Sequence, residues 1–166
     1  MNVTIRESTK SDADVDAIVA LSIALHQLHE ACDPRCSRTL DGAGNMYREE
    51  ALAWLDETDT RIMLAEDGSG EVVGMAIGRV ERRPDRDPPV SAHIRRVFVK
   101  ESARGRGVAR MLLKPLCTFF ASQDVAGVSL HYLIANELAS RFWAGLGFEP
   151  FLMNAKTTVA GLIEKL

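Results

Sequence analysis

A glycine-rich loop between two apolar segments constrains this chain more than any other feature of its sequence. The loop reads Arg-Gly-Arg-Gly at residues 104–107. Residues 94–99 before it are typical of a strand, and residues 107–122 after it have helical spacing. The first amides of such a helix lack intrahelical partners and lie at the positive end of its dipole. Glycines allow close approach to the backbone, and the arginines offer forked donors that suit phosphate oxygens. The loop therefore predicts a site for a phosphate-bearing ligand.

The bulk composition excludes several classes of partner. The chain has 166 residues and a formal net charge of −3, and its hydrophobic fraction of 46% is ordinary for one globular domain spanning residues 1–166. The arginines of residues 82–106 alternate with acidic residues, so we expect no nucleic-acid partner. No apolar run approaches the roughly 20 residues of a membrane span, and the first residues have no signal-peptide core. We therefore expect a cytoplasmic protein with no membrane association.

Hydrophobic periodicity predicts a mixed α/β layer structure. A hairpin turn is predicted at residues 67–70, Asp-Gly-Ser-Gly, between two of the strands. Strands are predicted over residues 3–7, 61–66, 71–80, 94–99 and 128–134, with a last extended segment over 148–159. Helices are predicted over residues 11–30, 47–55, 107–122 and 136–145.

The strand before the glycine loop has an irregular pattern. Ile94 and Val97 are both apolar but lie three residues apart, whereas strict alternation needs an even spacing. A one-residue bulge near Arg95 and Arg96 would return both side chains to one face and leave backbone groups unpaired. A short strand that is buried on both faces is the alternative interpretation.

Two motifs resemble those of the GNAT superfamily, the acetyl-CoA-dependent N-acetyltransferases. The family motif Gln/Arg-x-x-Gly-x-Gly/Ala corresponds to Arg104-x-x-Gly107-x-Ala109, and the preceding strand ends in Val-Phe-Val at residues 97–99. The second family motif, Asn-x-x-Ala-x-x-Phe-Tyr-x-x-x-Gly-Phe, corresponds to residues 136–148 at every position except Trp143. The order of elements resembles the family from residue 3 to about 159.

This resemblance implies a fold, a co-substrate and a set of residues. The fold would be a mixed, mostly antiparallel sheet whose parallel fourth and fifth strands splay apart, with helices on both faces. Acetyl-CoA would bind with its pyrophosphate on the amides of residues 105–109 and its pantetheine arm in the slot between the splayed strands. The implied cofactor-binding residues are Val97, Phe98, Val99, Arg104, Gly105, Arg106, Gly107, Val108, Ala109, Asn136, Ala139 and Phe142.

The implied reaction is direct attack by a neutral primary amine on the thioester. His93 is the best candidate base, since an imidazole titrates near neutral pH, and a surface histidine is the alternative. Glu81 is a lower-ranked base that would act through water. Trp143 stands where family members often place a tyrosine that protonates the thiolate, and an indole is not a useful acid. Tyr132 is a substitute candidate, so the proton donor stays open.

Other residues define competing interpretations. His26, His29, Cys32 and Cys36 have the residue types of a zinc site, but Cys36 lies beyond a proline, so a pocket rim is favoured and no metal is expected. The three cysteines have no framework spacing and are predicted to be free thiols. Trp143 also keeps open a different function, a catalytically silent acyl-CoA-binding sensor or assembly module.

The acceptor is not identified by the sequence. Residues 22–55, 82–92 and the last extended segment would form its pocket, and we expect a small-molecule or peptide amine there. Acidic side chains such as Asp33 and Glu50 would attract a cationic acceptor, but a solvated surface explains them equally well. The oligomeric state is open, with a homodimer among the alternatives.

Overall fold

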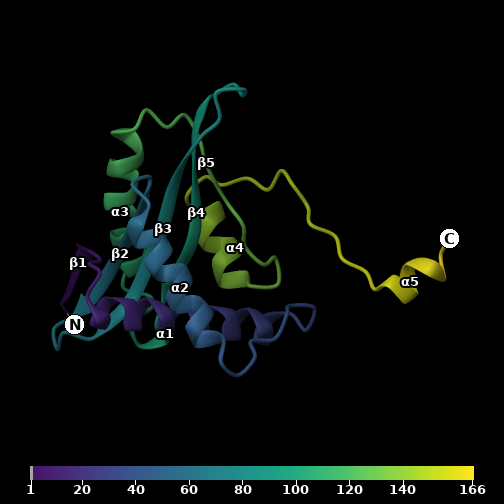
Figure 1. Cartoon of the computed structure of the whole chain (residues 1–166), viewed down its shortest axis with the longest axis horizontal. Helices are drawn as coiled ribbons and strands as arrows, with labels where there is room; N and C mark the ends of the chain where they lie inside the picture. Colours follow the sequence, from purple (N-terminus) through teal and green to yellow (C-terminus); the bar gives the residue numbers. More distant parts are fainter. Residues whose placement is uncertain (1) are drawn as a thin grey trace.

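The computed structural model describes residues 2–166, and Figure 1 shows their arrangement. The strands are β1 Val3–Glu7, β2 Thr60–Asp67, β3 Val72–Arg82, β4 Val90–Val99 and β5 Val128–Leu130. The helices are α1 Asp12–Cys32, α2 Ala43–Asp56, α3 Val108–Ala121, α4 Glu137–Ala144 and α5 Val159–Ile163, and a 3-10 turn covers Glu101–Ala103. None of the helices within residues 2–166 has both the length and the apolarity that crossing a membrane requires.

The five strands form one sheet in the order β1-β2-β3-β4-β5. The first four are antiparallel to their neighbours, and β5 runs parallel to β4. The hairpin between β2 and β3 turns at the predicted residues, where the Asp67 side chain accepts hydrogen bonds from the backbone of Ser69 and Glu71. This topology confirms the predicted mixed sheet.

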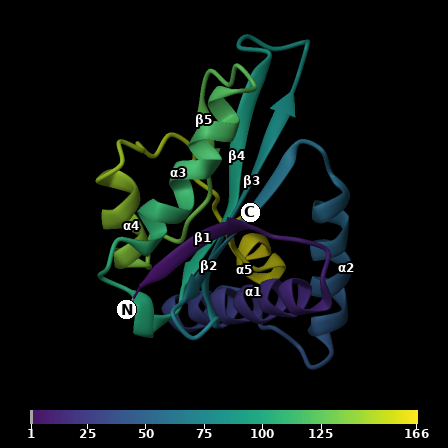
Figure 2. The same cartoon turned by 90° about the vertical axis from the view of Figure 1, so that its left-hand side faces the viewer.

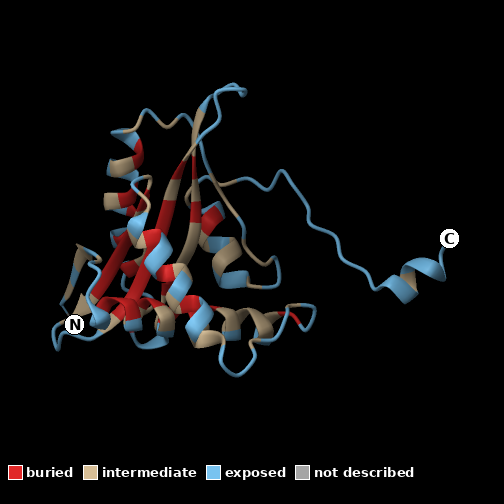
Figure 3. Ribbon diagram, in the orientation of Figure 1, coloured by how far each residue is buried: buried red, intermediate tan, exposed pale blue. Residues whose placement is uncertain are grey.

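Helices cover both faces of the sheet, as Figure 2 shows, with α1 and α2 on one side and α3 and α4 on the other. Each side has its own apolar core, and the buried residues of β2 and β3 lie between them (Figure 3). The α3 core is packed tightly against β3, since a Cβ atom on Gly78 would lie 2.6 Å from Cζ of Phe120. On the other side Ile18 and Leu21 of α1 are buried against Ile77.

An ion pair fixes the start of α1 against β1. Asp14 is buried and accepts hydrogen bonds from both terminal nitrogens of Arg6, at 2.6 and 2.9 Å. Ser11 caps the helix by accepting a hydrogen bond from the Asp14 amide at 3.3 Å. The Arg6 guanidinium lowers the pKa of Asp14 to about 2, with help from the amide and hydroxyl of Thr9. This contact lies at the edge of the sheet farthest from β5.

The predicted bulge in β4 is present. Ile77 of β3 pairs with Arg96 and the next residue, Gly78, pairs with Ile94, so Arg95 is the extra residue. Ile94 and Val97 both contact the α3 core, and Phe98 belongs to the α1 core. The odd spacing in the sequence is therefore explained by one inserted residue.

Strand β5 is short, and β4 continues beyond it. Residues 128–130 pair with residues 92–94, and from Arg95 onward β4 has no strand on that side within residues 2–166. The predicted strand over 128–134 is therefore wrong for its second half, because the chain diverges from β4 at the bulge. The two strands splay as expected from the resemblance.

The last extended segment is also different from the prediction. Residues 149–158 belong to no strand, and α5 follows them. A strand needs a neighbour to pair its backbone groups. The segment runs out beyond α4 and away from the body of the protein instead of pairing with its own sheet (Figure 1).

Candidate active site

The glycine loop presents unpaired backbone amides. Gly105 and Gly107 have φ angles of 73° and 77°, in the left-handed region where glycine carries no steric penalty. Gly107 precedes α3 and no side chain caps the helix there. The first hydrogen bond into the helix is donated by the amide of Met111 to the carbonyl of Gly107, at 3.0 Å. Within residues 2–166 no backbone acceptor is found for the amides of residues 105–107, and those of residues 108–110 are free by helix geometry.

The space above the loop is open. Cβ atoms placed on Gly105 and Gly107 would have no protein atom within 4 Å, so a ligand can reach the backbone directly. The Nε of Arg104 donates a hydrogen bond to the Val99 carbonyl at 3.0 Å, and its guanidinium lies 5.8 Å from the centre of the Phe98 ring. Arg104 is thereby held beside the loop, whereas the Arg106 side chain is exposed.

A cavity of about 750 Å³ begins at this loop and lies between the second half of β4 and α4. That volume falls within the roughly 300–1,000 Å³ of typical small-molecule sites. It brings together the predicted cofactor-binding residues from β4, the loop and α4, with the exception of Arg106. Those that line it are Val97, Phe98, Val99, Arg104, Gly105, Gly107, Val108, Ala109, Asn136, Ala139 and Phe142. Neither His93 nor Glu81 lines it.

The second motif forms the wall opposite β4. The Oδ1 of Asn136 accepts a hydrogen bond from the Ala139 amide at 3.1 Å and so caps α4. This contact uses the carbonyl end of the side chain, which leaves the amide group of Asn136 available as a donor at the cavity. Arg110, which the sequence analysis did not select, also lines the cavity and stacks 6.0 Å from the centre of the Phe142 ring.

Trp143 is a core residue that reaches the cavity wall. It is buried, and its ring makes edge contacts with Phe142 and Phe148 at centroid distances of 4.9 and 5.3 Å. The large side chain is thus held by packing on α4. Tyr132 lines the same cavity and is half-buried, and it carries a titratable hydroxyl.

His93 lies one layer behind the cavity. Its Nδ1 is 3.0 Å from the Ser129 hydroxyl, and its ring centre is 4.9 Å from that of His131, which lines the cavity. Burial lowers the pKa of His93, and the nearby His131 and Arg95 lower it further against an opposing effect of Glu81. Sequence reasoning missed His131 because the residue follows β5 in an irregular segment, where no periodicity marks which way it points.

Helix α1 closes the cavity on the other side of the sheet, with Leu25, Leu28, His29 and Cys32 along its wall. Burial lowers the pKa of His29, and the neighbouring His26 lowers it further. The Nδ1 of His26 donates to the Ser22 carbonyl at 3.0 Å. Among residues 2–166, no three His, Cys, Asp or Glu side chains are grouped as a metal site would need.

Arg96 is a largely covered cation at the bulge that the sequence analysis left unassigned. Its guanidinium lies over Trp54 and Tyr47, at 4.6 and 5.5 Å from their ring centres. It donates hydrogen bonds to Glu50 at 2.7 Å and to Ser22 at 3.1 Å. Only 12% of its side chain is exposed, so the cation is fixed in the cavity wall.

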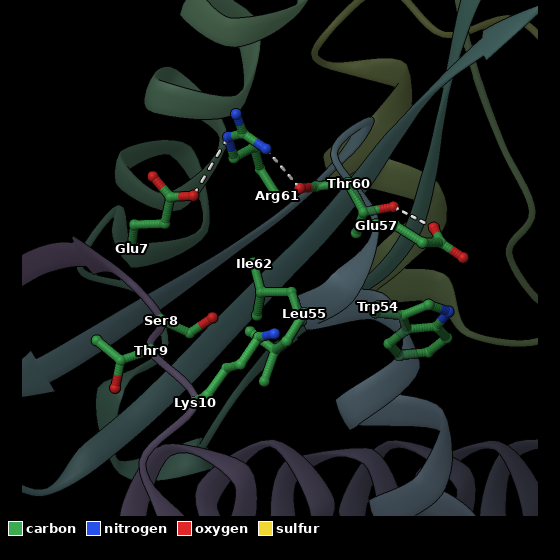
Figure 4. Close-up of a pocket in the computed structure, with 10 residues that line it drawn as sticks. All are labelled: Glu7, Ser8, Thr9, Lys10, Trp54, Leu55, Glu57, Thr60, Arg61 and Ile62. Carbon is green, nitrogen blue, oxygen red and sulfur yellow. Dashed lines mark hydrogen bonds and ion pairs between the residues drawn. The ribbon is translucent and has the colours of Figure 1, made fainter.

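A second, smaller pocket lies between the end of β1 and the start of β2 (Figure 4). Its volume is about 120 Å³, below the range of most ligand sites. At its rim Arg61 pairs with Glu7 at 3.2 Å, and the Thr60 hydroxyl donates to Glu57 at 2.5 Å. None of the predicted site residues lies there.

Comparisons with known proteins agree with this geometry. The model of the acetyltransferase (GNAT) family matches residues 23–148. No curated protein matches the sequence significantly.

Solved structures share the fold at low identity. The BH1408 protein of Bacillus halodurans, solved as a tetramutant, has a TM-score of 0.81 and 18% identity, over 94% of this chain and 99% of that one. Glucosamine-6-phosphate N-acetyltransferase from Arabidopsis thaliana has a TM-score of 0.69 and 17% identity, over 96% and 99%. An aminoglycoside N-acetyltransferase in complex with CoA has a TM-score of 0.68 and 16% identity, over 95% and 94%.

Proposed function

This chain belongs to the acetyltransferase (GNAT) family, and we propose that residues 1–166 act as one domain that transfers an acetyl group from acetyl-CoA to a primary amine. The observation that carries the proposal is a row of unpaired amides at residues 105–109 that opens into a cavity along the unpaired edge of β4. The amides suit a pyrophosphate, and the strand edge suits the amides of a pantetheine arm.

The residues present fit acetyl-CoA at both ends of the cavity. Arg104 and Arg110 supply positive charge next to the amides of the loop, and open space lies above Gly107. The backbone of residues 97–99 has no strand partner on the cavity side, where the Val99 carbonyl accepts from Arg104, so the backbone groups of Val97 and the Val99 amide can accept the pantetheine as an added strand. The free amide group of Asn136 can donate to the same arm from the opposite wall.

Acetyl-CoA supplies the thioester that an amine can attack, and the protein supplies orientation and proton transfer. The amide of Val97, beside the bulge, is the proposed donor to the developing oxyanion, because the next amide, that of Phe98, faces β3. The cavity extends between the diverging strands β4 and β5 as far as α1. An amine that enters between α1 and β4 would therefore reach the thioester end of the pantetheine arm from the opposite side of the sheet.

The proposed base is His93, with Ser129 selecting its tautomer. The Ser129 hydroxyl donates its single proton to the Ala92 carbonyl at 3.3 Å, so it can only accept from Nδ1 of His93. The lone pair of His93 is then on Nε2. His131 lines the cavity with its ring centre 4.9 Å from that of His93, and we assign it as the group that passes the amine proton to His93. The lowered pKa keeps His93 neutral and able to accept a proton at neutral pH.

The proposed proton donor to the CoA thiolate is Tyr132. Trp143 cannot act as an acid, and its ring is held in the core. Tyr132 is the phenol that lines the cavity, and it follows β5 where the two strands splay.

The acceptor is proposed to be a small-molecule or peptide amine. Two proteins of similar fold are named as acetyltransferases of an aminoglycoside and of glucosamine 6-phosphate, both of which carry amines. In this chain Glu50 pairs with Arg96 of the cavity wall, and this carboxylate is proposed to attract a cationic amine.

The experiment is a CoA-release assay with acetyl-CoA and a panel of amines: small amines, aminoglycosides and peptide N-termini. Calorimetry of acetyl-CoA and of CoA with the same protein is run in parallel. Release with at least one amine supports the transferase. Tight acetyl-CoA binding without turnover across the panel would instead identify the silent acyl-CoA-binding module, and absence of binding would contradict both.

A further inference from the structure

The residues that line the large cavity carry an unequal set of charges. Four of them are arginines, and within residues 2–166 a single carboxylate, that of Glu137 on α4, is among them. Arg104 and Arg110 lie at the glycine-loop end, where the phosphates of acetyl-CoA are proposed to bind. Arg95 and Arg96 lie instead at the bulge of β4, and the proposed binding of acetyl-CoA uses neither of them. These two cations are therefore available to the other ligand of the cavity, the acceptor.

The bulge places the Arg95 and Arg96 side chains on the same face of the sheet. Consecutive residues of a regular strand point to opposite faces, whereas an inserted residue breaks that alternation. The two guanidiniums lie 5.2 and 4.6 Å from the centre of the Trp54 ring on α2. Their neighbours Ile94 and Val97 contact the α3 core instead. Two positive charges thus meet on the side of the sheet that α1 and α2 cover (Figure 2).

The carboxylates around Trp54 do not neutralise these cations completely. Arg96 has a partner of its own in Glu50. Arg95 shares Glu57 with Arg79 of β3, at 3.8 and 3.7 Å from the same oxygen, which are distances beyond a hydrogen bond. No side-chain hydrogen bond of Arg95 is found within residues 2–166. Three guanidiniums therefore face two carboxylates, which leaves one positive charge for a ligand that carries one negative charge.

Both arginines are shielded from water. Only 22% of the Arg95 side chain and 12% of the Arg96 side chain are exposed. A charge attracts a counter-ion more strongly where water is partly excluded, and the forked donors of a guanidinium fit a carboxylate. Leu25 and Leu28 of α1 line the same cavity. The wall suits a molecule that has one carboxylate and an apolar body.

We propose that the acceptor is an amine that also carries a carboxylate, and that Arg95 and Arg96 bind this carboxylate. The proposal rests on the transferase function above and names its acceptor class, amino acids with an apolar side chain. Arg96 directly precedes Val97, whose amide is the proposed oxyanion donor, so the carboxylate site lies within one side-chain length of the reacting thioester. The amine and the carboxylate are therefore close together in one molecule, as they are in an α-amino acid.

The pair of Glu50 and Arg96 presents opposite charges to such a molecule. Glu50 lies 2.7 Å from Arg96 and is not itself part of the cavity lining. The amine of the acceptor is attracted toward Glu50, while its carboxylate is attracted toward the arginines. A polycation such as an aminoglycoside would instead lie against two guanidiniums, so we expect aminoglycosides to be poor acceptors.

The test measures binding to the full chain with CoA bound, so that no acetyl transfer occurs during the titration. L-leucine, L-methionine and L-phenylalanine are each compared with the corresponding amide, which keeps the amine and the side chain and lacks the negative charge. Ligand-observed NMR gives the dissociation constants. At least one of the acids should bind about tenfold or more tightly than its amide, because its carboxylate accepts charge-assisted hydrogen bonds. With acetyl-CoA, kcat/KM should show the same preference.

The variants Arg95→Met and Arg96→Met remove the two charges in turn, and methionine keeps an apolar chain against Trp54. Either variant should weaken binding of the preferred acid by about tenfold and leave the affinity for its amide unchanged. Arg95→Met keeps the hydrogen bonds of Arg96, so it serves as the test even where Arg96→Met does not fold. The matched control is Arg82→Met, which removes a guanidinium that lies 3.4 Å from Asp59 and outside the cavity. This control should keep the preference for the acid.

Three results would overturn the proposal. Equal affinity for acid and amide in all three pairs, or no binding of any acid, means that the cavity has no carboxylate site. A preference for the acid that survives both arginine variants places the site elsewhere. The two proposals fail differently. Binding of the acid that depends on Arg95 and Arg96, without turnover, supports the carboxylate site and contradicts the transferase, whereas turnover of amines without a preference for acids does the reverse.

Discussion

The two halves of β4 have different surroundings. Before Arg95 the strand is paired with β3 on one edge and β5 on the other, and its side chains serve the two cores. After Arg95 it keeps β3 but faces the cavity with its other edge. The paired half and the regular strands β1–β3 hold the fold together, while the half-paired segment leaves backbone groups for a ligand. The comparison shows that the cavity lies where one edge of β4, after Arg95, has no strand partner.

The largest expected effect is on the half-paired side. Gly107→Leu should weaken acetyl-CoA binding by about 100-fold or more, because the side chain fills the open space above the unpaired amides. Calorimetry measures the dissociation constant. Gly70→Leu is the matched control: Gly70 has the same left-handed backbone, with φ 85°, and open space, but lies in the β2–β3 turn. Equal affinity in the two variants would contradict the pyrophosphate assignment.

The next effect concerns the base behind the cavity. His93→Ala should lower kcat by about 100-fold, a typical contribution of a general base, with little change in acetyl-CoA affinity. The acidic limb of the wild-type rate profile should lie below the ordinary histidine pKa of about 6.5, since burial lowers the pKa of His93. The variant should lose that limb. Glu81→Gln is the comparison, and a greater loss there would make Glu81 the base.

A substitution beside the regular strands should lower the free energy of unfolding and leave acetyl-CoA binding unchanged. Asp14→Asn should cost about 2 kcal/mol of unfolding free energy, because Arg6 loses its buried partner and keeps only Glu66. The folded pKa of Asp14, about 2, lies below its ordinary value. The stabilisation is therefore complete above about pH 4 and is lost as the pH falls toward 2. Urea unfolding at several pH values measures this. Asp16→Asn, an exposed carboxylate on α1, is the control.

A smaller effect is expected where the strands part. Tyr132→Phe should lower kcat by about tenfold, because water can replace a phenol as proton donor to a thiolate. Pre-steady-state CoA release separates this step from binding.

Trp143→Phe should lower the melting temperature and leave the pH dependence of turnover unchanged, since its ring packs between Phe142 and Phe148. A changed pH profile of turnover in that variant would mean that the Trp143 indole takes part in the reaction.

The sequence predicted the parts of the site that depend on local backbone. The unpaired amides follow from the glycines of the loop, and the inserted Arg95 follows from the spacing of Ile94 and Val97. Residues brought in by tertiary packing were predicted only in part. His29 and Cys32, expected at a pocket rim, line the cavity, whereas His131 was missed because no periodicity marks its contact with the cavity.

In the C-terminal segment, the sequence pattern predicted a strand that the structure does not contain. Residues 148–159 have the composition of a strand, and composition cannot supply the neighbour that a strand needs. Strand β5 was overestimated for a related reason. Its second half diverges from β4 at the bulge, and a bulge in one strand says little about where the adjacent strand ends.

Arg95, the inserted residue of the bulge, could be deleted without changing which face the other side chains of β4 occupy. Removing it would leave Ile94, Val97 and Val99 on the α3 side and Phe98 on the α1 side, because the remaining residues already alternate correctly. An in-frame deletion of one codon is thus compatible with every core contact of β4. It erases the irregularity at which β5 diverges, together with the contacts of the Arg95 guanidinium with Trp54, at 5.2 Å from the ring centre, and with Glu57, at 3.8 Å. We therefore expect that deletion of this one residue would remove the cavity beside β4 while the sheet and its two cores are kept.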